Sequence, residues 1–211
     1  MSSFPALRAL PLLALAALGG CYSLSPVKVD SALEPQNDAQ AGYLVGVLGK
    51  TPEGANGQAL LIRKRGTDQV ARVQVTDTWA LKTRHDLDGR DWSSPFAIAL
   101  QPGQYELYNV NFTHNGYQLW KKDDFSIPVT ISAGKAAYIG NFRASCFQNL
   151  TSACYFLRRD QLAKDSAALK GAYPHLPAIE EAKLSRLDNA APIIVDQGTN
   201  PKLFQVLQGG K

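Results

Sequence analysis

The chain has 211 residues, of which 45% are hydrophobic, and this length supports one hydrophobic core or one core with an appendage. Its 22 Lys and Arg residues stand against 18 Asp and Glu residues, which gives a formal net charge of +4. The basic residues form only short, separate clusters, so composition and charge argue against a nucleic-acid-binding protein.

Residues 1–20 have the pattern of a secretory signal peptide. Arg8 precedes an apolar run over residues 9–17, which is too short to cross a bilayer because a membrane helix needs about 20 apolar residues. The run ends in Leu-Gly-Gly-Cys at residues 18–21. This ending resembles the lipobox of bacterial lipoproteins, in which the signal is cut before the cysteine and the cysteine is acylated.

The lipobox resemblance implies that Cys21 is the lipidation site and that the protein contacts a membrane through its N-terminal lipid. In that family an aspartate after the cysteine tends to retain the protein at the inner membrane, and here Tyr22 occupies this position. The resemblance therefore implies a lipoprotein of the cell outer membrane that faces the periplasm. Residues 21–41 are rich in Ser, Pro, Asp, Gln and Ala, which predicts a lipidated flexible tether.

Residues 42–158 contain one short β-type run after another, separated by turn residues. The predicted strands cover residues 43–48, 59–65, 70–76, 96–100, 105–109, 125–131, 136–144 and 153–158. Hydrophobic residues alternate with polar residues over 70–76, which is the period of a half-buried strand. Pro128 assigns its strand to a sheet edge. The fold class predicted for residues 42–158 is an antiparallel β-sandwich.

Two motifs in this region resemble a recurring module. They are Phe96-x-x-x-Leu100-x-Pro102-Gly103-x-Tyr105 and Gly134-Lys135-x-x-Tyr138-x-Gly140. Together they cover about residues 95–145 and are similar to the transthyretin-like and immunoglobulin-like β-sandwich domains of bacterial envelope lipoproteins. The resemblance implies a fold but no chemistry.

The hydrophobic period changes from two to 3.6 after Arg159. Asp160 is suited to cap a helix that runs to about residue 172, and Pro177 is suited to the first turn of a second helix. We therefore expect residues 159–189 to form a helical hairpin packed on the sandwich. Residues 190–211 hold two short apolar clusters between Gly, Asn and Pro, which predicts an extended tail.

Cys146 and Cys154 remain once Cys21 is lipidated, and in an oxidising envelope such a pair predicts a disulfide between neighbouring strands. A redox or metal-binding pair is the alternative, but the spacing is not C-x-x-C and no histidine is close in sequence. His85, His114 and His175 have no metal-ligand spacing. We therefore expect no metal site and no cofactor.

The stretch from residue 77 to residue 92 is the candidate binding loop, because long loops in small domains often carry function. Its candidate residues are Asp77, Trp79, His85, Asp86, Asp88, Asp91 and Trp92. The acids around Gly89 suit a calcium ion, although the EF-hand order is absent. The tryptophans would serve a glycan or protein surface, or else they cover the edge of the sandwich.

The S-x-x-K pattern of penicillin-recognising enzymes occurs at residues 132–135 and again at 25–28, in a predicted turn and in the tether, so it carries no weight. The sequence also lacks the G-x-S-x-G, H-E-x-x-H, G-x-x-x-x-G-K-[ST] and G-x-G-x-x-G motifs, and we expect a protein that is not an enzyme. The expected function is a binding or scaffolding module for envelope proteins, which uses strand edges, the loop and the tail clusters around Ile194 and Phe204. A periplasmic ligand or cell-wall glycan binder that uses the 77–92 loop is the alternative, and a hydrolase ranks third.

Overall fold

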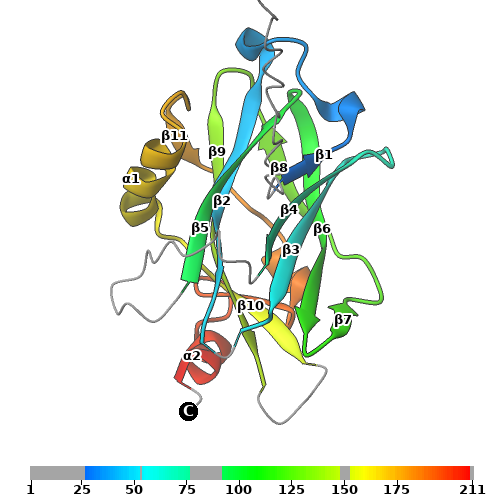
Figure 1. Ribbon diagram of the computed structural model, residues 1–211, viewed down its shortest axis with the longest axis vertical. Coiled ribbons are helices and arrows are strands. Elements are labelled where there is room, and N and C mark those ends of the chain that lie inside the picture. The colour runs from blue at the N-terminus through cyan, green and yellow to red at the C-terminus, as the bar shows by residue number, and fades with distance from the viewer. Residues whose placement is uncertain (1–26, 53, 77–91, 148–152, 210–211) are drawn as a thin grey trace, which may run out of the picture.

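The computed structural model describes residues 27–52, 54–76, 92–147 and 153–209, which form two β-sheets packed face to face (Figure 1). The fold class is mainly β, as predicted. Within these described ranges each sheet contains six strands, and two α-helices accompany them.

The first sheet is antiparallel throughout. Its order is β1 (Val27–Val29), β4 (Val70–Thr76), β3 (Gly57–Lys64), β6 (Gly103–His114) and β7 (Tyr117–Trp120), and β8 (Ile127–Ile131) also pairs with β6. β7 pairs with the C-terminal part of β6 and β8 with its N-terminal part. Pro128 thus lies in an edge strand, as expected for a residue without a backbone N–H.

The second sheet is mixed rather than purely antiparallel. Its order is β12 (Ile194–Asp196), β10 (Cys154–Arg159), β9 (Ala136–Cys146), β2 (Gly42–Lys50) and β5 (Trp92–Leu100), and β11 (Ile179–Glu181) also pairs with β9. β2 and β9 are parallel, because the chain between them crosses to the first sheet and returns.

The main core lies between the sheets and follows the alternation seen in the sequence. In β4, Ala71 and Val73 are fully buried, whereas the intervening Arg72 is partly exposed. Tyr105 is also fully buried, and its hydroxyl donates a 2.8 Å hydrogen bond to the Gln101 carbonyl, across the turn predicted at Pro102 and Gly103. The same burial raises the pKa of Tyr105 to about 12.

Both helices cover the outer face of the second sheet (Figure 1). α1 (Leu162–Ala172) buries Leu169 against Val45 and Tyr138. The carboxylate of Asp165 on α1 is buried and accepts a 2.7 Å hydrogen bond from the Tyr138 hydroxyl. α2 (Pro201–Gly209) buries Phe204 against β10 and β12.

The helix predicted from residue 177 to 189 is wrong. Residues 179–181 form β11, which pairs in parallel with residues 136–138 of β9, and a 3₁₀ turn, η4, covers Leu187–Ala190. β10 pairs with β9 only from Asn141 onward, so the first residues of β9 needed another partner for their backbone groups. Backbone pairing with β9 therefore stabilises a strand here more than Pro177 and the two glutamates favour a helix.

Two further boundaries differ from those predicted. Residues 27–41, predicted as tether, belong to the fold: β1 pairs with β4, Leu33 of the 3₁₀ turn η1 (Ser31–Leu33) is fully buried, and a second such turn, η2, covers Asp38–Gln40. Residues 190–209, predicted as an extended tail, contain β12 and α2. In both segments, short groups of apolar residues pack into the core or onto the second sheet.

Candidate functional site

Most of the predicted site residues lie outside the described residues. These are Cys21 and, in the candidate loop, Asp77, Trp79, His85, Asp86, Asp88 and Asp91. Trp92 is described: it begins β5, pairs with Lys50 at the end of β2 and is half-buried. The binding role of the loop therefore stays a prediction.

The predicted disulfide between Cys146 and Cys154 is confirmed, with an S–S distance of 2.03 Å. The two residues lie directly opposite each other in the antiparallel ladder of β9 and β10, so neighbouring strands carry the bond, as expected. The enclosed loop is short, and chain-entropy reasoning gives it about 2.5 kcal/mol. Locally, the bond joins the end of β9 to the start of β10.

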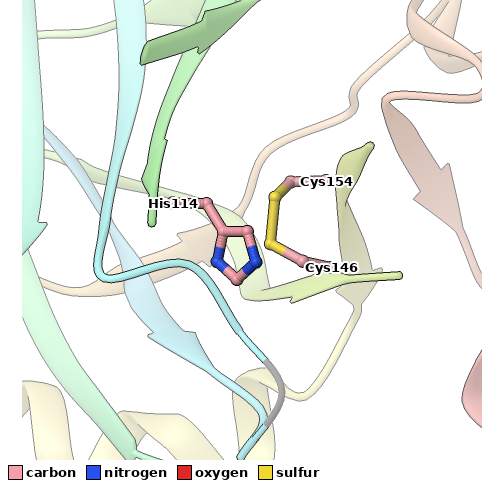
Figure 2. A group of neighbouring side chains, drawn as sticks. All are labelled: His114, Cys146 and Cys154. Carbon is pink, nitrogen blue, oxygen red and sulfur yellow. A yellow bond between two sulfur atoms is a disulfide. The ribbon is translucent and has the colours of Figure 1, made fainter. Parts of the chain in front are cut away.

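His114 lies beside this disulfide (Figure 2). It ends β6 in the first sheet, and its imidazole reaches across to the sulfur atoms on the second sheet. One ring nitrogen of His114 and the Sγ atoms of Cys146 and Cys154 all lie within 4.8 Å of one another. Sequence reasoning missed this cluster because the histidine is far from both cysteines along the chain and comes from the other sheet.

Polar atoms near this end of the core have few partners. Nε2 of His114 is 3.2 Å from the side-chain Nδ2 of Asn115, but Nδ1 is buried and, within the described part of the chain, has no hydrogen-bond partner. Gln58 is only 2% exposed, and neither polar atom of its amide has a partner there. An unsatisfied buried polar group costs about 1–3 kcal/mol, so these groups gain from any ligand that reaches them.

Gln58 and His114 share the inward face of the first sheet. Gln58 of β3 is in register with Phe112, which precedes His114 by two residues on β6. Phe112 in turn packs on Phe156 of the second sheet, with ring centroids 4.7 Å apart. The histidine, the disulfide and the glutamine therefore gather at one end of the sandwich interior.

A cavity of about 500 Å³ lies elsewhere, beside β10, β11 and β12. Its charged lining residues are Arg158, Asp160, Glu181, Lys183 and Asp196. A hydrogen bond with Asp160, together with the negative charge of that carboxylate, raises the pKa of Glu181. The lining thus mixes both signs of charge, and two of its residues, Arg158 and Asp196, form an ion pair with each other.

The surface offers a second kind of site at β7. Tyr117 and Trp120, at the two ends of this strand, are 61% and 62% exposed. β7 pairs with β6 on one side and, among the described strands, has no partner on the other (Figure 1). Large exposed aromatic side chains on an open strand edge are typical of a recognition surface.

The tail clusters named from the sequence do not provide such a surface. Ile194 is fully buried in the main core, and Phe204, on the side of α2 that faces the sheet, is 2% exposed. The exposed apolar side chains of this region are instead Leu203 and Val206 on the outer side of α2.

Comparison with known proteins leaves these sites as the main guide to function. No protein-family model, no curated protein and no solved structure matches the chain. Among the helices of the described residues, none is long and apolar enough to cross a membrane.

Proposed function

We propose that the protein is a non-enzymatic lipoprotein of the outer membrane that binds an extended segment of another envelope protein along β7. The observation that carries this proposal is the open edge of β7 with Tyr117 and Trp120 exposed on it. An open edge offers backbone hydrogen bonds to an added strand, and the aromatic side chains offer contact area.

The turn before β7 determines which backbone groups face outward. Asn115 and Gly116 both have positive φ, 48° and 84°, and connect His114 to Tyr117 as a two-residue hairpin turn. In such a turn the N–H of Tyr117 points back to β6. Because the direction alternates along a strand, the N–H and C=O of Gln118 point to the open side. By the same alternation those of Trp120 do so too, and Gln118 is the one of the two that leaves the Trp120 ring in place when it is substituted.

The proposed anchor is the lipid on Cys21, and it rests on the lipobox pattern of residues 18–21. Stable attachment needs more than one acyl chain, because a single chain binds a membrane only marginally. The Cys21→Ser variant should appear in soluble fractions or remain uncut. Unchanged membrane fractionation of this variant would contradict the anchor.

The binding surface is tested by site-specific photo-crosslinking in cells. A photoreactive residue at position 120 should form one discrete adduct with an envelope protein. The matched control is position 206 on α2, because Val206 is similarly exposed, at 69%, but lies on the second sheet's side of the molecule. The same adduct pattern at both positions, or no adduct at position 120, would contradict docking at β7.

The alternative proposal, a binder of cell-wall glycans, is favoured by the exposed rings of Tyr117 and Trp120, because such rings stack on sugars. Stacking needs the ring but not the strand edge. Trp120→Ala would abolish glycan binding, whereas removal of the Gln118 N–H would leave it intact. Strand addition requires both the Trp120 ring and the Gln118 N–H.

A further inference from the structure

The most unusual side-chain cluster in the described residues is the one formed by His114, Cys146 and Cys154 (Figure 2). Two sulfur atoms and one imidazole are held within 4.8 Å of one another by three different strands, β6, β9 and β10. A cross-strand disulfide fixes a hairpin without a histidine, so the third member of the cluster has no role in that bond.

We propose that these three residues form a redox-gated site for a thiophilic d¹⁰ cation, of the Zn(II) or Cu(I) class, which is closed when the cysteines are oxidised and binds the ion when they are reduced. Thiolate and imidazole together are the ligand set that these ions prefer. Around a tetrahedral ion the ligand atoms stand about 3.3–3.8 Å apart, given metal–ligand bonds of about 2.0–2.3 Å. After reduction the two sulfur atoms, 2.03 Å apart in the disulfide, would have to separate by about 1.7 Å, and the His114 ring would have to approach them by about 1 Å.

The gating reaction is a thiol–disulfide exchange. A dithiol reductant supplies two electrons and two protons: the Cys146–Cys154 bond breaks, two thiols form, and the reductant becomes a disulfide. When the ion binds, both thiols become thiolates and release their protons to the solvent. In the oxidised state the two sulfur atoms form a disulfide, which is a poor metal ligand. His114 is then the one good ligand of the three residues, and a single ligand does not hold an ion.

The unsatisfied polar atoms at this end of the core support the same assignment. The buried Nδ1 of His114 has no hydrogen-bond partner in the described part of the chain, although a ring nitrogen in a finished core is usually paired. The Gln58 amide lies on the same inward face and is equally unsatisfied. An ion ligated by His114 with a bound water would supply what these atoms lack, since the three protein ligands leave the fourth position of a tetrahedral site open.

The experiment uses the full chain with Cys21→Ser, so that Cys146 and Cys154 are its only thiols. The protein is reduced under anaerobic conditions, freed of reductant, checked by circular dichroism, and titrated with Zn(II) and with Cu(I) against chromophoric chelators. We expect one equivalent of ion per chain in the reduced protein and none in the oxidised protein.

The decisive pair of variants is His114→Ala and His175→Ala. His175 is exposed and remote in the chain from the cysteines, so its removal controls for loss of any imidazole. His114→Ala should weaken the affinity at least about tenfold, whereas His175→Ala should leave it unchanged. Thiol counting of the oxidised His114→Ala protein shows whether its disulfide still forms, which separates loss of a ligand from loss of the fold.

Three results would overturn the proposal. Equal affinity in the His114→Ala protein would mean that the thiols bind the ion without the histidine. Absence of one-to-one binding to the reduced protein would mean that the cysteines serve only as a structural bridge. Loss of the β-sheet signal on reduction, without recovery when the ion is added, would lead to the same conclusion.

Discussion

Arg158 on β10 and Asp196 on β12 form an ion pair that is almost completely enclosed, with 6% and 5% of their side chains exposed. Burial by itself would raise the pKa of Asp196, but hydrogen bonds from the Arg158 guanidinium and from Thr199 outweigh it and lower this pKa. Nε of Arg158 also donates a 2.7 Å hydrogen bond to the Ile139 carbonyl of β9. The pair therefore joins three strands of the second sheet.

Removing one member of this pair should be costly. Asp196→Asn leaves the buried Arg158 charge without its counter-ion, and we expect the free energy of unfolding to fall by about 3–5 kcal/mol. The control is Glu180→Gln, which breaks the Lys135–Glu180 pair, because both of its side chains are 55% exposed. Such a surface pair contributes at most about 1 kcal/mol. Urea unfolding at neutral pH measures both; equal losses would contradict the structural role of the buried pair.

The Arg158–Asp196 pair contributes to the free energy of unfolding at neutral pH and loses this contribution in acid. The folded-state pKa of Asp196 lies below its unfolded value of about 3.9, so its ionisation stabilises the native state above that pH. This contribution disappears as pH falls through the lower folded-state pKa. The stability difference between wild type and Asp196→Asn should therefore shrink below about pH 4. A difference that stayed constant with pH would contradict the assignment.

Gly140 is required where Arg158 crosses β9. Its φ is +123°, and a Cβ atom there would lie 2.7 Å from Nε of Arg158. Gly140→Ala should thus lower the free energy of unfolding by at least about 1–3 kcal/mol, through strain and the steric clash. Gly171→Ala is the control, because α1 leaves open space at that position and alanine favours a helix by about 0.5–1 kcal/mol. If both variants lost stability, the close approach at Gly140 would not be the cause.

The C-terminal segment packs on the second sheet and contributes to the stability of the fold. Phe204 packs on Tyr155, Leu157 and Val195, so Phe204→Ala should cost about 3–5 kcal/mol. Val206→Ala, on the exposed side of α2, should change stability by less than about 0.5 kcal/mol. Thermal unfolding of the two variants measures this. A Phe204→Ala protein as stable as the Val206→Ala protein would instead mean that the segment is an undocked tail.

The sequence predicted the strands whose own pattern is strong and failed where distant contacts decide the structure. The alternation over residues 70–76 matches β4, and the run at 136–144 matches β9. β7 has four residues and no clear alternation, so it was not predicted. The local sequence of residues 179–181 predicts the start of a helix. In the structure these residues form a strand that pairs with the first residues of β9.

The candidate site shows the same limit. The pairing of Cys146 with Cys154 could be predicted, because only two cysteines remained and the compartment favours oxidation. The neighbouring His114 could not, because the strands that bring it to the sulfur atoms belong to opposite sheets. Only the packing of the two sheets creates that contact.

Comparing Gln118→Pro with Gln118→Ala tests whether β7 accepts a strand from another envelope protein. Proline removes the outward N–H at an edge that pairs with no other described strand, whereas alanine removes only the side chain. The measurement is the yield of the adduct crosslinked at position 120, in cells that contain equal amounts of each folded variant. We predict that Gln118→Pro lowers the yield at least about tenfold and that Gln118→Ala retains it, since strand addition depends on main-chain hydrogen bonds. Equal yields from the two variants would contradict strand addition at β7.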